Sequence, residues 1–226
     1  MRSDELVGIV ARTLRTVAPQ RRALVAIDGV GASGKSTFAA RLAHAVDARP
    51  VVLLHVDDFF NPSRIRDAKG RYSSEGFWLD TYNDDALITW ALTPLAAGGD
   101  GLYRPAAFDR LTDHVVQPPQ IHAPRDALVL VEGTFVHRDA LTPFWEYSIY
   151  LDVPFHETAR RMARRFGADP DTEHRLRSRY EGAQRLYFSA AAPWSRASLV
   201  INNTDVENPT IIHPDEASAA RWQPAP

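Results

Sequence analysis

Short apolar runs recur along the chain and alternate with longer segments of helical character. Four of them, ALVAID (23–28), VVLLHV (51–56), ALVLVEG (127–133) and YSIYLDV (147–153), are rich in β-branched and other apolar residues. Runs of this length and composition are typical of buried β-strands. A fifth run, ASLVIN (197–202), predicts one more strand towards the end of the chain.

Helical segments fill the intervals between these runs. The sequence predicts helices over residues 4–18, 36–46, 84–97, 156–166 and 173–191. Apolar strands that alternate with helices favour a parallel sheet covered on both faces. The predicted fold class is therefore α/β, with a parallel β-sheet sandwiched by helices.

The other segments show no clear period. Residues 61–76 are polar and contain glycine, so we expect a mobile loop there. Residues 100–124 hold four prolines and short strand-like pieces, and we expect the tail after Pro209 to be loosely ordered. Since the chain has neither an internal repeat nor a clear linker, a single domain over residues 1–226 is predicted.

A glycine motif, Gly29-x-x-x-x-Gly34-Lys35-Ser36, follows the first predicted strand and opens a predicted helix. Its glycines let backbone N–H groups turn inward around phosphate oxygens, and the helix N-terminus favours negative charge. Lys35 supplies a cation for the β- and γ-phosphates, and Ser36 supplies a hydroxyl for Mg²⁺. The motif therefore predicts a site for a nucleoside triphosphate and Mg²⁺, and it does not distinguish ATP from GTP. The residues expected to contact the nucleotide are Gly29, Gly31, Ala32, Ser33, Gly34, Lys35, Ser36 and Thr37.

Carboxylates follow two further predicted strands. Asp57 and Asp58 end the second strand, and Glu132 ends the third. In open α/β sheets, ligands bind beyond the carboxyl ends of the strands, so these side chains and the glycine loop are expected to share one pocket. Asp57 and Asp58 could instead be a capping or turn pair. Next to a phosphate site, however, one carboxylate can accept the proton of a substrate hydroxyl. Glu132 would be costly to bury unpaired, which favours a role near Mg²⁺.

Arginines cluster in the stretch ARRMARRF, where Arg161, Arg164 and Arg165 share a helix face. This pattern fits a solvated basic helix and also a lid whose guanidinium groups stabilise the charge of a transferred phosphoryl group. Spacing alone leaves both interpretations open.

Tyr180, Gln184 and Tyr187 share a face of the following helix, and such spacing reflects packing more often than ligand contact. The histidines His55, His114 and His137 have no metal-ligand spacing, and we expect structural roles for them.

Composition narrows the class of protein. The chain has 226 residues, 45% of them hydrophobic, and a formal net charge of −2, which gives no reason to expect nucleic acid or a membrane as a partner. It has no cysteine, which excludes disulfides and thiolate zinc sites. The N-terminal residues lack an apolar run long enough for a signal peptide or a membrane span, so we expect a cytoplasmic enzyme. A homo-oligomer is compatible with these features.

The segments IDGVGASGKST, VDDFFNP, LVEG and RRMARR together resemble the uridine kinase-like P-loop kinases. This family includes uridine–cytidine, nicotinamide riboside and pantothenate kinases and relatives of phosphoribulokinase. The likeness runs from about residue 23 to 205. It implies a P-loop kinase domain with an acceptor-binding insertion at about 61–124 and an arginine-rich lid at about 156–180.

The resemblance also implies residue roles. Asp57 would be the base that accepts the proton of the acceptor hydroxyl, with Lys35 beside the phosphates. Ser36 and Glu132 would surround Mg²⁺, and we expect Asp57 close to the same ion. Arg161 and Arg164 would be the catalytic arginines of the lid.

The acceptor-binding segments depart from the family pattern. In LDTYNDDAL, Asn83 stands where the nucleoside kinases have an aspartate that holds the ribose hydroxyls, unless Asp80 or Asp84 takes that place after a small shift. In RPAAFD, Phe108 replaces the family's tyrosine and Asp109 is kept. The residues expected at the acceptor are Asp58, Phe59, Asp80, Tyr82, Asn83, Phe108, Asp109 and Gln184.

Three functions compete. The favoured one is transfer of the γ-phosphoryl group of ATP to a primary alcohol, above all the 5′-hydroxyl of uridine or cytidine, with nicotinamide riboside, pantothenate or a sugar as alternatives. A switch or motor NTPase is less favoured, because the chain has no Asn-Lys pair for a GTPase base-reading motif and has Glu-Gly in place of an Asp-Glu pair after the third strand. A kinase-shaped protein that has lost catalysis would be expected to lack Lys35, Asp57 or Glu132, and all three are present.

Overall fold

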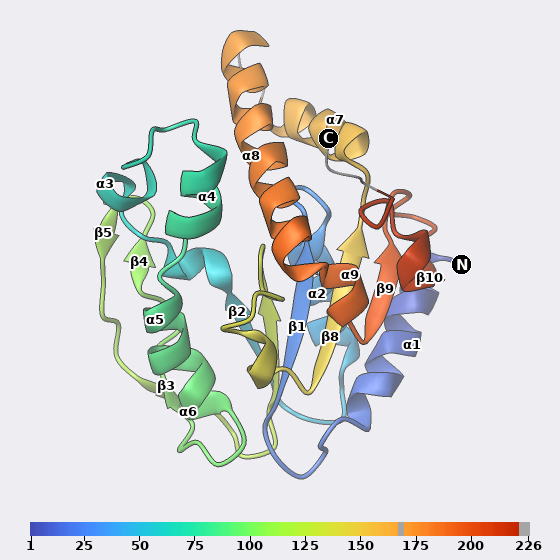
Figure 1. The fold of residues 1–226 in the computed structure, drawn as a ribbon. Helices are drawn as coiled ribbons and strands as arrows, with labels where there is room; N and C mark the ends of the chain where they lie inside the picture. Colours follow the sequence, from blue (N-terminus) through green and yellow to red (C-terminus); the bar gives the residue numbers. More distant parts are fainter. Residues whose placement is uncertain (167–169, 222–226) are drawn as a thin grey trace.

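A mostly parallel β-sheet lies at the centre of the computed structural model, which describes residues 1–166 and 170–221, with side chains outside 165–173 (Figure 1). Within the described residues the sheet has six strands. In spatial order they are β10 (Thr210–Ile212), β9 (Leu199–Asn202), β8 (Tyr147–Asp152), β1 (Ala23–Gly29), β7 (Leu128–Glu132) and β2 (Val51–His55). All neighbouring pairs are parallel except β9 and β10. The predicted α/β fold and the five predicted strands are confirmed.

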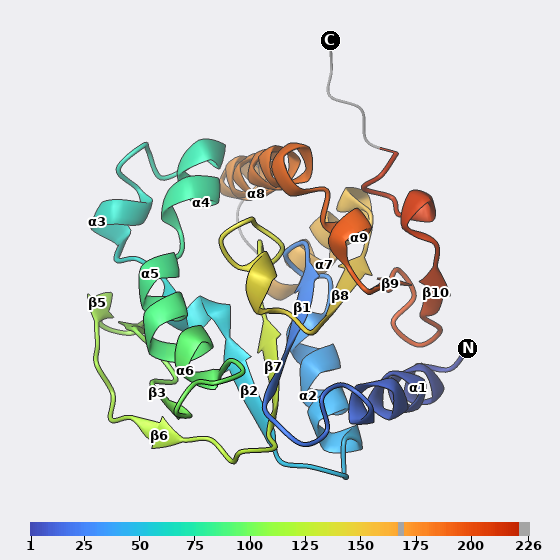
Figure 2. The same cartoon turned by 60° about the horizontal axis from the view of Figure 1, so that its bottom comes forward.

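Helices cover both faces of this sheet (Figures 1 and 2). The larger helices are α1 (Ser3–Arg15), α2 (Lys35–Ala45), α7 (Phe155–Phe166) and α8 (Pro170–Ala191). Because side chains alternate along a strand, Val25 and Ile27 of β1 pack in one core with α1 and α2, whereas Leu24 and Ala26 pack in a second core with α8. Burial on both faces explains why the strand sequences are nearly continuous apolar runs.

The segment between β2 and β7 forms a separate group of short elements beside β2 (Figure 1). Its helical elements are η1 (Val56–Phe59), α3 (Ser63–Arg66), α4 (Ser74–Asp80), α5 (Asp84–Leu87), the π-helical η2 (Ile88–Leu92) and α6 (Thr93–Leu95). Its strands form two small sheets, β3 (Leu102–Tyr103) with β6 (Ile121–His122) and β4 (Phe108–Asp109) with β5 (His114–Val115). The helix predicted over 84–97 is present as the consecutive elements α5, η2 and α6.

Two expectations about loops differ from the structure. Residues 61–76 contain α3 and the first turn of α4, where the Ser73 side chain caps the helix by accepting a hydrogen bond from the Gly76 N–H at 3.0 Å. The tail after Pro209 contains β10 and a short helix, η4 (Pro214–Glu216). It is held to the sheet by Asp152, which accepts hydrogen bonds from the backbone and hydroxyl of Ser218, both at 2.8 Å. These elements are too short to show a hydrophobic period.

The carboxyl ends of β1, β2 and β7 meet at one edge of the sheet. Ile27 and His55 are both in register with Glu132 on β7, so the residues that follow the three strands are neighbours.

The remaining short elements are η3 (Thr142–Phe144) and α9 (Pro193–Arg196). None of the helices in 1–166 and 170–221 has the length and apolar character needed to cross a bilayer.

Candidate active site

The glycine motif forms a tight loop between β1 and α2. Ala32 and Gly34 adopt left-handed backbone conformations, with φ of 61° and 95°, and Gly34 is the N-cap of α2. A Cβ atom on Gly29 would come within 2.7 Å of the Leu151 carbonyl oxygen, so the backbones approach closely here because this residue is glycine. The predicted strand–loop–helix context of the motif is therefore present.

Lys35 lies inside this loop. Its Nζ donates hydrogen bonds to the carbonyl oxygens of Gly29 at 2.9 Å and Val30 at 3.1 Å, and the residue is only 9% exposed. The loop is also tied from outside, because the Asn203 amide donates to the Ser33 carbonyl oxygen at 2.7 Å. A buried ammonium at the N-terminus of a helix is suited to bind phosphate oxygens. Thr37 lies on the exposed side of α2.

Glu132 forms the second part of the site. Its Oε1 accepts a hydrogen bond from the Ser36 hydroxyl at 2.9 Å and lies 2.6 Å from His55 Nδ1. Burial alone would raise the pKa of Glu132, but the His55 hydrogen bond and the Lys35 charge outweigh it, so the pKa lies below its ordinary value. The same hydrogen bond raises the pKa of His55.

The groups around Glu132 fit Mg²⁺. This ion is usually held by one or two carboxylates together with substrate phosphates and water, rather than by a closed protein cage. Ser36 and Glu132 offer one hydroxyl and one ionised carboxylate next to the phosphate loop. Among the described residues, no three His, Asp or Glu side chains are grouped so that they could hold a metal ion by themselves.

Asp57 forms the third part of the site and lies on the turn η1 directly after β2. Its Oδ1 accepts a hydrogen bond from the Tyr82 hydroxyl at 3.0 Å, and its Oδ2 lies 2.9 Å from a guanidinium nitrogen of Arg110. These two partners fix the orientation of the carboxylate. Burial, the nearby Asp57 charge and the hydrogen bond to Asp57 raise the pKa of Tyr82 well above its ordinary value, so this phenol is a hydrogen-bond donor. Burial also raises the pKa of the neighbouring Asp58.

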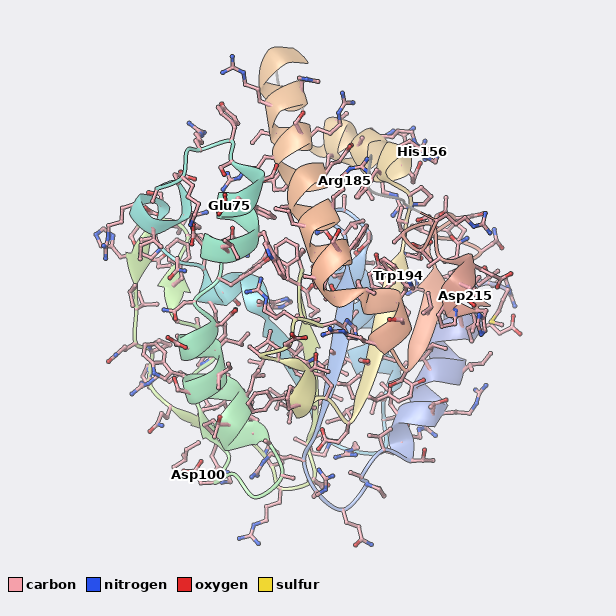
Figure 3. The ribbon with its side chains drawn as sticks, in the orientation of Figure 1. Glu75, Asp100, His156, Arg185, Trp194 and Asp215 are labelled. Atoms are coloured by element: carbon pink, nitrogen blue, oxygen red, sulfur yellow. The ribbon has the colours of Figure 1, made fainter. Side chains whose placement is uncertain are left out.

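One pocket of about 190 Å³ is lined both by the glycine loop, at Gly31 and Ala32, and by Asp57. It is lined by Gly31, Ala32, Asp57, Phe60, Phe77, Tyr82, Thr134, Met162, Tyr180 and Gln184. Gln184 is 3% exposed, and its amide oxygen has no hydrogen-bond partner among the described residues. In Figure 3, Glu75 marks α4 and His156 marks α7, which lie on opposite sides of α8. The pocket lies among these helices and the phosphate loop.

The three residues proposed for a sugar contact do not line this pocket. Asp80 accepts a hydrogen bond from Lys69 Nζ at 2.6 Å. Asn83 caps α5 by accepting from the Ala86 N–H at 3.0 Å, and Asp84 pairs with Arg138. Each of the three side chains therefore has a partner outside the pocket.

The other expected acceptor residues are split between the pocket and its surroundings. Tyr82 and Gln184 line the pocket, whereas Phe59 is fully buried in the core and its neighbour Phe60 forms the pocket wall. Phe108 packs behind Phe60 with ring centroids 6.1 Å apart. Asp109 accepts a hydrogen bond from the Leu111 N–H, which lowers the pKa of its carboxyl group, and it lies outside the pocket lining.

The two arginines expected in the lid have different surroundings in the structure. Arg161 donates hydrogen bonds to Glu157 and to the carbonyl oxygens of Ala32, Asn203 and Thr204, at 2.8 to 3.1 Å. It thus anchors α7 to the phosphate loop. Arg164 is exposed one turn further along α7. The side chain of Arg165 lies outside the described residues.

The ion pairs of Glu157 with Arg160 and Arg161 predict an acid-dependent stability. These guanidinium groups lower the pKa of Glu157 from 4.5 to about 2, so their stabilisation is fully present above pH 4.5 and is lost as the pH falls towards 2. We expect Glu157→Gln to lower Tm by a few degrees at pH 6, and the difference from wild type to shrink between pH 4.5 and 3. Thermal melts across this pH range measure it. A Tm difference that stays constant between pH 6 and 3 would contradict the assignment.

Several residues of the site were not predicted. His55 contacts Glu132, Arg110 contacts Asp57, and Phe60, Phe77, Thr134 and Tyr180 line the pocket. For His55 a signal exists, since VVLLH and LVLVE have equal length and pair residue for residue. For Arg110 and Thr134 the sequence offers no such signal, because their positions depend on how distant loops fold over the sheet.

Comparisons with known proteins bear on the fold. No protein-family model and no curated protein sequence matches the chain. Solved structures do match. A possible uridine kinase from Bacillus stearothermophilus superposes with a TM-score of 0.71 at 21% identity, covering 87% of this chain and 97% of its own.

Two further solved structures have the same arrangement. A candidate fructose transport system kinase from Silicibacter sp. TM1040 gives a TM-score of 0.68 at 23% identity, covering 84% of this chain and 96% of its own. D-glycerate 3-kinase from Cryptococcus neoformans gives 0.56 at 9% identity, covering 92% and 99%. With the glycine loop between β1 and α2 and the mostly parallel sheet in place, the chain has the fold of these solved structures.

Proposed function

We propose that the protein is an ATP-dependent phosphotransferase that moves the γ-phosphoryl group to a primary alcohol of a small metabolite. One observation carries this proposal: a single pocket has walls from both the phosphate loop, at Gly31 and Ala32, and the carboxylate Asp57. An alcohol in this pocket would lie between a phosphate donor and a base. The kinase-type fold supports the same conclusion.

Each polar residue has a defined task in this proposal. Lys35 and the N–H groups of the loop bind the phosphates, and Ser36 and Glu132 hold Mg²⁺. The ion, when bound, offsets charge on the phosphate oxygens. Asp57 accepts the proton of the acceptor hydroxyl while the hydroxyl oxygen forms a bond to the γ-phosphorus. ADP leaves with the electrons of the broken P–O bond. Tyr82 and Arg110 orient Asp57 for this step.

The acceptor proposed first is the 5′-hydroxyl of uridine or cytidine, which the family resemblance favours. The aromatic walls Phe60, Phe77 and Tyr180 suit a flat base, and the Gln184 amide oxygen, which no group in the described part of the chain binds, suits an N–H donor. Asp80, Asn83 and Asp84 are engaged elsewhere, so the ribose contact of the nucleoside kinases has no counterpart in the pocket lining. Nicotinamide riboside, pantothenate and simple sugars therefore remain alternative acceptors. In each case residues 61–124 would be the acceptor-binding part and residues 156–180 the lid.

A coupled ADP-release screen tests the function. Purified protein with MgATP is offered uridine, cytidine, nicotinamide riboside, pantothenate and simple sugars, one at a time. We expect ADP release well above the acceptor-free rate with one of these alcohols, and its 5′-deoxy or otherwise dehydroxylated analogue to be inactive. ADP release that is the same with and without every alcohol would favour an NTPase without a metabolic acceptor.

Arg164 gives a prediction about charge in the transition state. If its guanidinium closes on the transferred phosphoryl group, Arg164→Ala should lower kcat at least about tenfold while ATP affinity changes only a few-fold. Steady-state kinetics with an ATP titration separates the two effects. Arg12→Ala, which removes an exposed arginine from α1, is the matched control and should leave both unchanged. A loss confined to the acceptor KM would instead assign Arg164 to acceptor binding.

A further inference from the structure

A buried polar network lies directly behind the phosphate loop. Asp28 Oδ1 accepts a hydrogen bond from the Gly29 N–H at 2.6 Å, and Oδ2 accepts from His137 Nδ1 at 2.8 Å and from the Tyr187 hydroxyl. The Tyr187 oxygen in turn accepts from the His137 backbone N–H at 3.0 Å. Asp28, His137 and Tyr187 are each at most 1% exposed. Burial alone would raise the pKa of Asp28, but its bonds to His137 and Tyr187 lower it, so the carboxylate is ionised.

The three residues come from three segments that each reach the candidate site. Asp28 is followed by Gly29, whose carbonyl oxygen binds Lys35. His137 lies in the loop after Glu132, the loop that contributes Thr134 to the pocket. Tyr187 lies on α8, seven residues after Tyr180 and three after Gln184, both of which line the pocket. The network therefore joins the phosphate-binding part of the site to two walls of the acceptor pocket.

The loop between β7 and His137 is strained. Phe135 has a φ of 72°, a conformation that bulky side chains rarely adopt. Its ring packs against Phe77, Trp78 and Tyr187 with centroids 4.9 to 5.7 Å apart. Strain of this kind persists where the surroundings impose it, and it is concentrated at functional sites. Here the network holds the loop on one side and the aromatic rings hold it on the other.

Stability alone is a poor explanation for the network. Burying an ionised carboxylate is costly, and well-packed apolar side chains often stabilise a core as much or more. His137 Nε2 is also buried without a hydrogen-bond partner among the described residues, which carries a further cost. A network that costs stability and connects three site segments is better explained by the geometry that it fixes.

We propose that Asp28, His137 and Tyr187 are positioning residues that couple the phosphate loop to α8, so that nucleotide binding sets the position of the acceptor wall. This inference rests on the proposed phosphotransferase function. In the coupled state, Tyr180 and Gln184 on α8 and Thr134 on the loop are held at a fixed place relative to the γ-phosphate. Small displacements of such groups have large effects on transfer rates.

Hydrogen exchange with saturating MgATP tests the coupling without needing turnover. In wild type we expect protection at residues 29–37, and also at 133–141 and 183–191. Tyr187→Phe keeps the ring packing and removes the hydroxyl, so it should keep the protection at 29–37 and lose most of it at 183–191. Tyr150→Phe is the matched control, since Tyr150 is equally buried and lies opposite Asp28 on β8, but among the described residues no hydrogen bond joins its hydroxyl to Asp28, His137 or Tyr187; it should behave as wild type.

Kinetics provide a second readout. We expect Tyr187→Phe to lower kcat about tenfold, with the Kd of MgATP unchanged within twofold, at a temperature well below its Tm. Asp28→Asn should act in the same direction, and the double variant should lose little more than the worse single variant, because both act through one contact. If Asp28→Asn does not fold, Tyr187→Phe and Tyr150→Phe decide the question alone.

The outcomes separate the two proposals. Protection of wild type at 29–37 but not at 183–191, or a Tyr187→Phe variant with normal kcat, overturns the coupling and leaves the phosphotransferase function standing. Wild type without protection at 29–37 overturns the proposed function itself. If the fractional loss of kcat in Tyr187→Phe equals the fraction of that variant that is unfolded, the network has only a structural role. This result also overturns the coupling.

Discussion

Asp57→Asn is expected to lower kcat by at least about two orders of magnitude while the Kd of MgATP stays within a few-fold of wild type. Asparagine has nearly the same shape, and its amide oxygen can still accept the hydrogen bond from Tyr82. The amide cannot take the acceptor proton, and it cannot form the ion pair with Arg110. The chemical step should therefore fail in an enzyme whose nucleotide site is intact.

The neighbouring carboxylate makes the test sharper. Asp58 follows Asp57 on the same turn, and burial raises its pKa. Asp58→Asn should reduce kcat much less than Asp57→Asn, as measured by steady-state kinetics with the preferred acceptor. A larger loss in Asp58→Asn would move the role of base to Asp58, and normal turnover in both variants would remove the base from this turn.

The second large effect is expected at the phosphate loop. Lys35→Ala should weaken MgATP binding at least about tenfold and lower kcat about a hundredfold or more, because in the proposed function the ammonium binds phosphates whose charge changes during transfer. The Lys35 ammonium is nearly buried and is held by two loop carbonyl oxygens, which fix its place inside the loop. Isothermal titration gives the affinity, and single-turnover kinetics give the rate.

The sequence supplies a natural control for this variant. Lys69 is the other lysine of the chain and is paired with Asp80 away from the pocket. Lys69→Ala should bind MgATP as wild type does. Lys35→Arg should lose MgATP binding and kcat as Lys35→Ala does, since a planar guanidinium does not fit the space of an ammonium in a tight loop. Unchanged ATP titration of Lys35→Ala would contradict the assignment of the phosphate site.

The fold and the edge of the sheet that carries the site could be predicted from the sequence. Apolar runs show buried strands, and parallel strands bring their carboxyl ends to one edge, so Asp57 and Glu132 had to lie near the glycine loop. The short elements could not be predicted. α3, α4 and β10 contain too few residues for a period, and contacts distant in sequence hold such elements in place, for example Ser63 with Asp113 at α3 and Ser74 with the Ser178 carbonyl oxygen at α4.

Side-chain orientation marks the limit of prediction within the site. Asn83 and Asp84 stand in a segment that resembles a sugar contact, yet a cap and an ion pair with Arg138 hold them away from the pocket. Arg161 has the spacing of a lid arginine, but it binds carbonyl oxygens brought close only by the folded chain. The partners of Asp84 and Arg161 are remote in sequence, so local patterns cannot identify them.

The central claim is that a phosphoryl group passes from ATP to an alcohol bound between the glycine loop and Asp57. ³¹P NMR of wild type with MgATP and the alcohol selected by the screen tests it most directly. We predict equal amounts of ADP and a phosphomonoester of that alcohol, and neither product at a comparable rate with Asp57→Asn. ADP accompanied only by inorganic phosphate, at the same rate with or without the alcohol, would contradict the account.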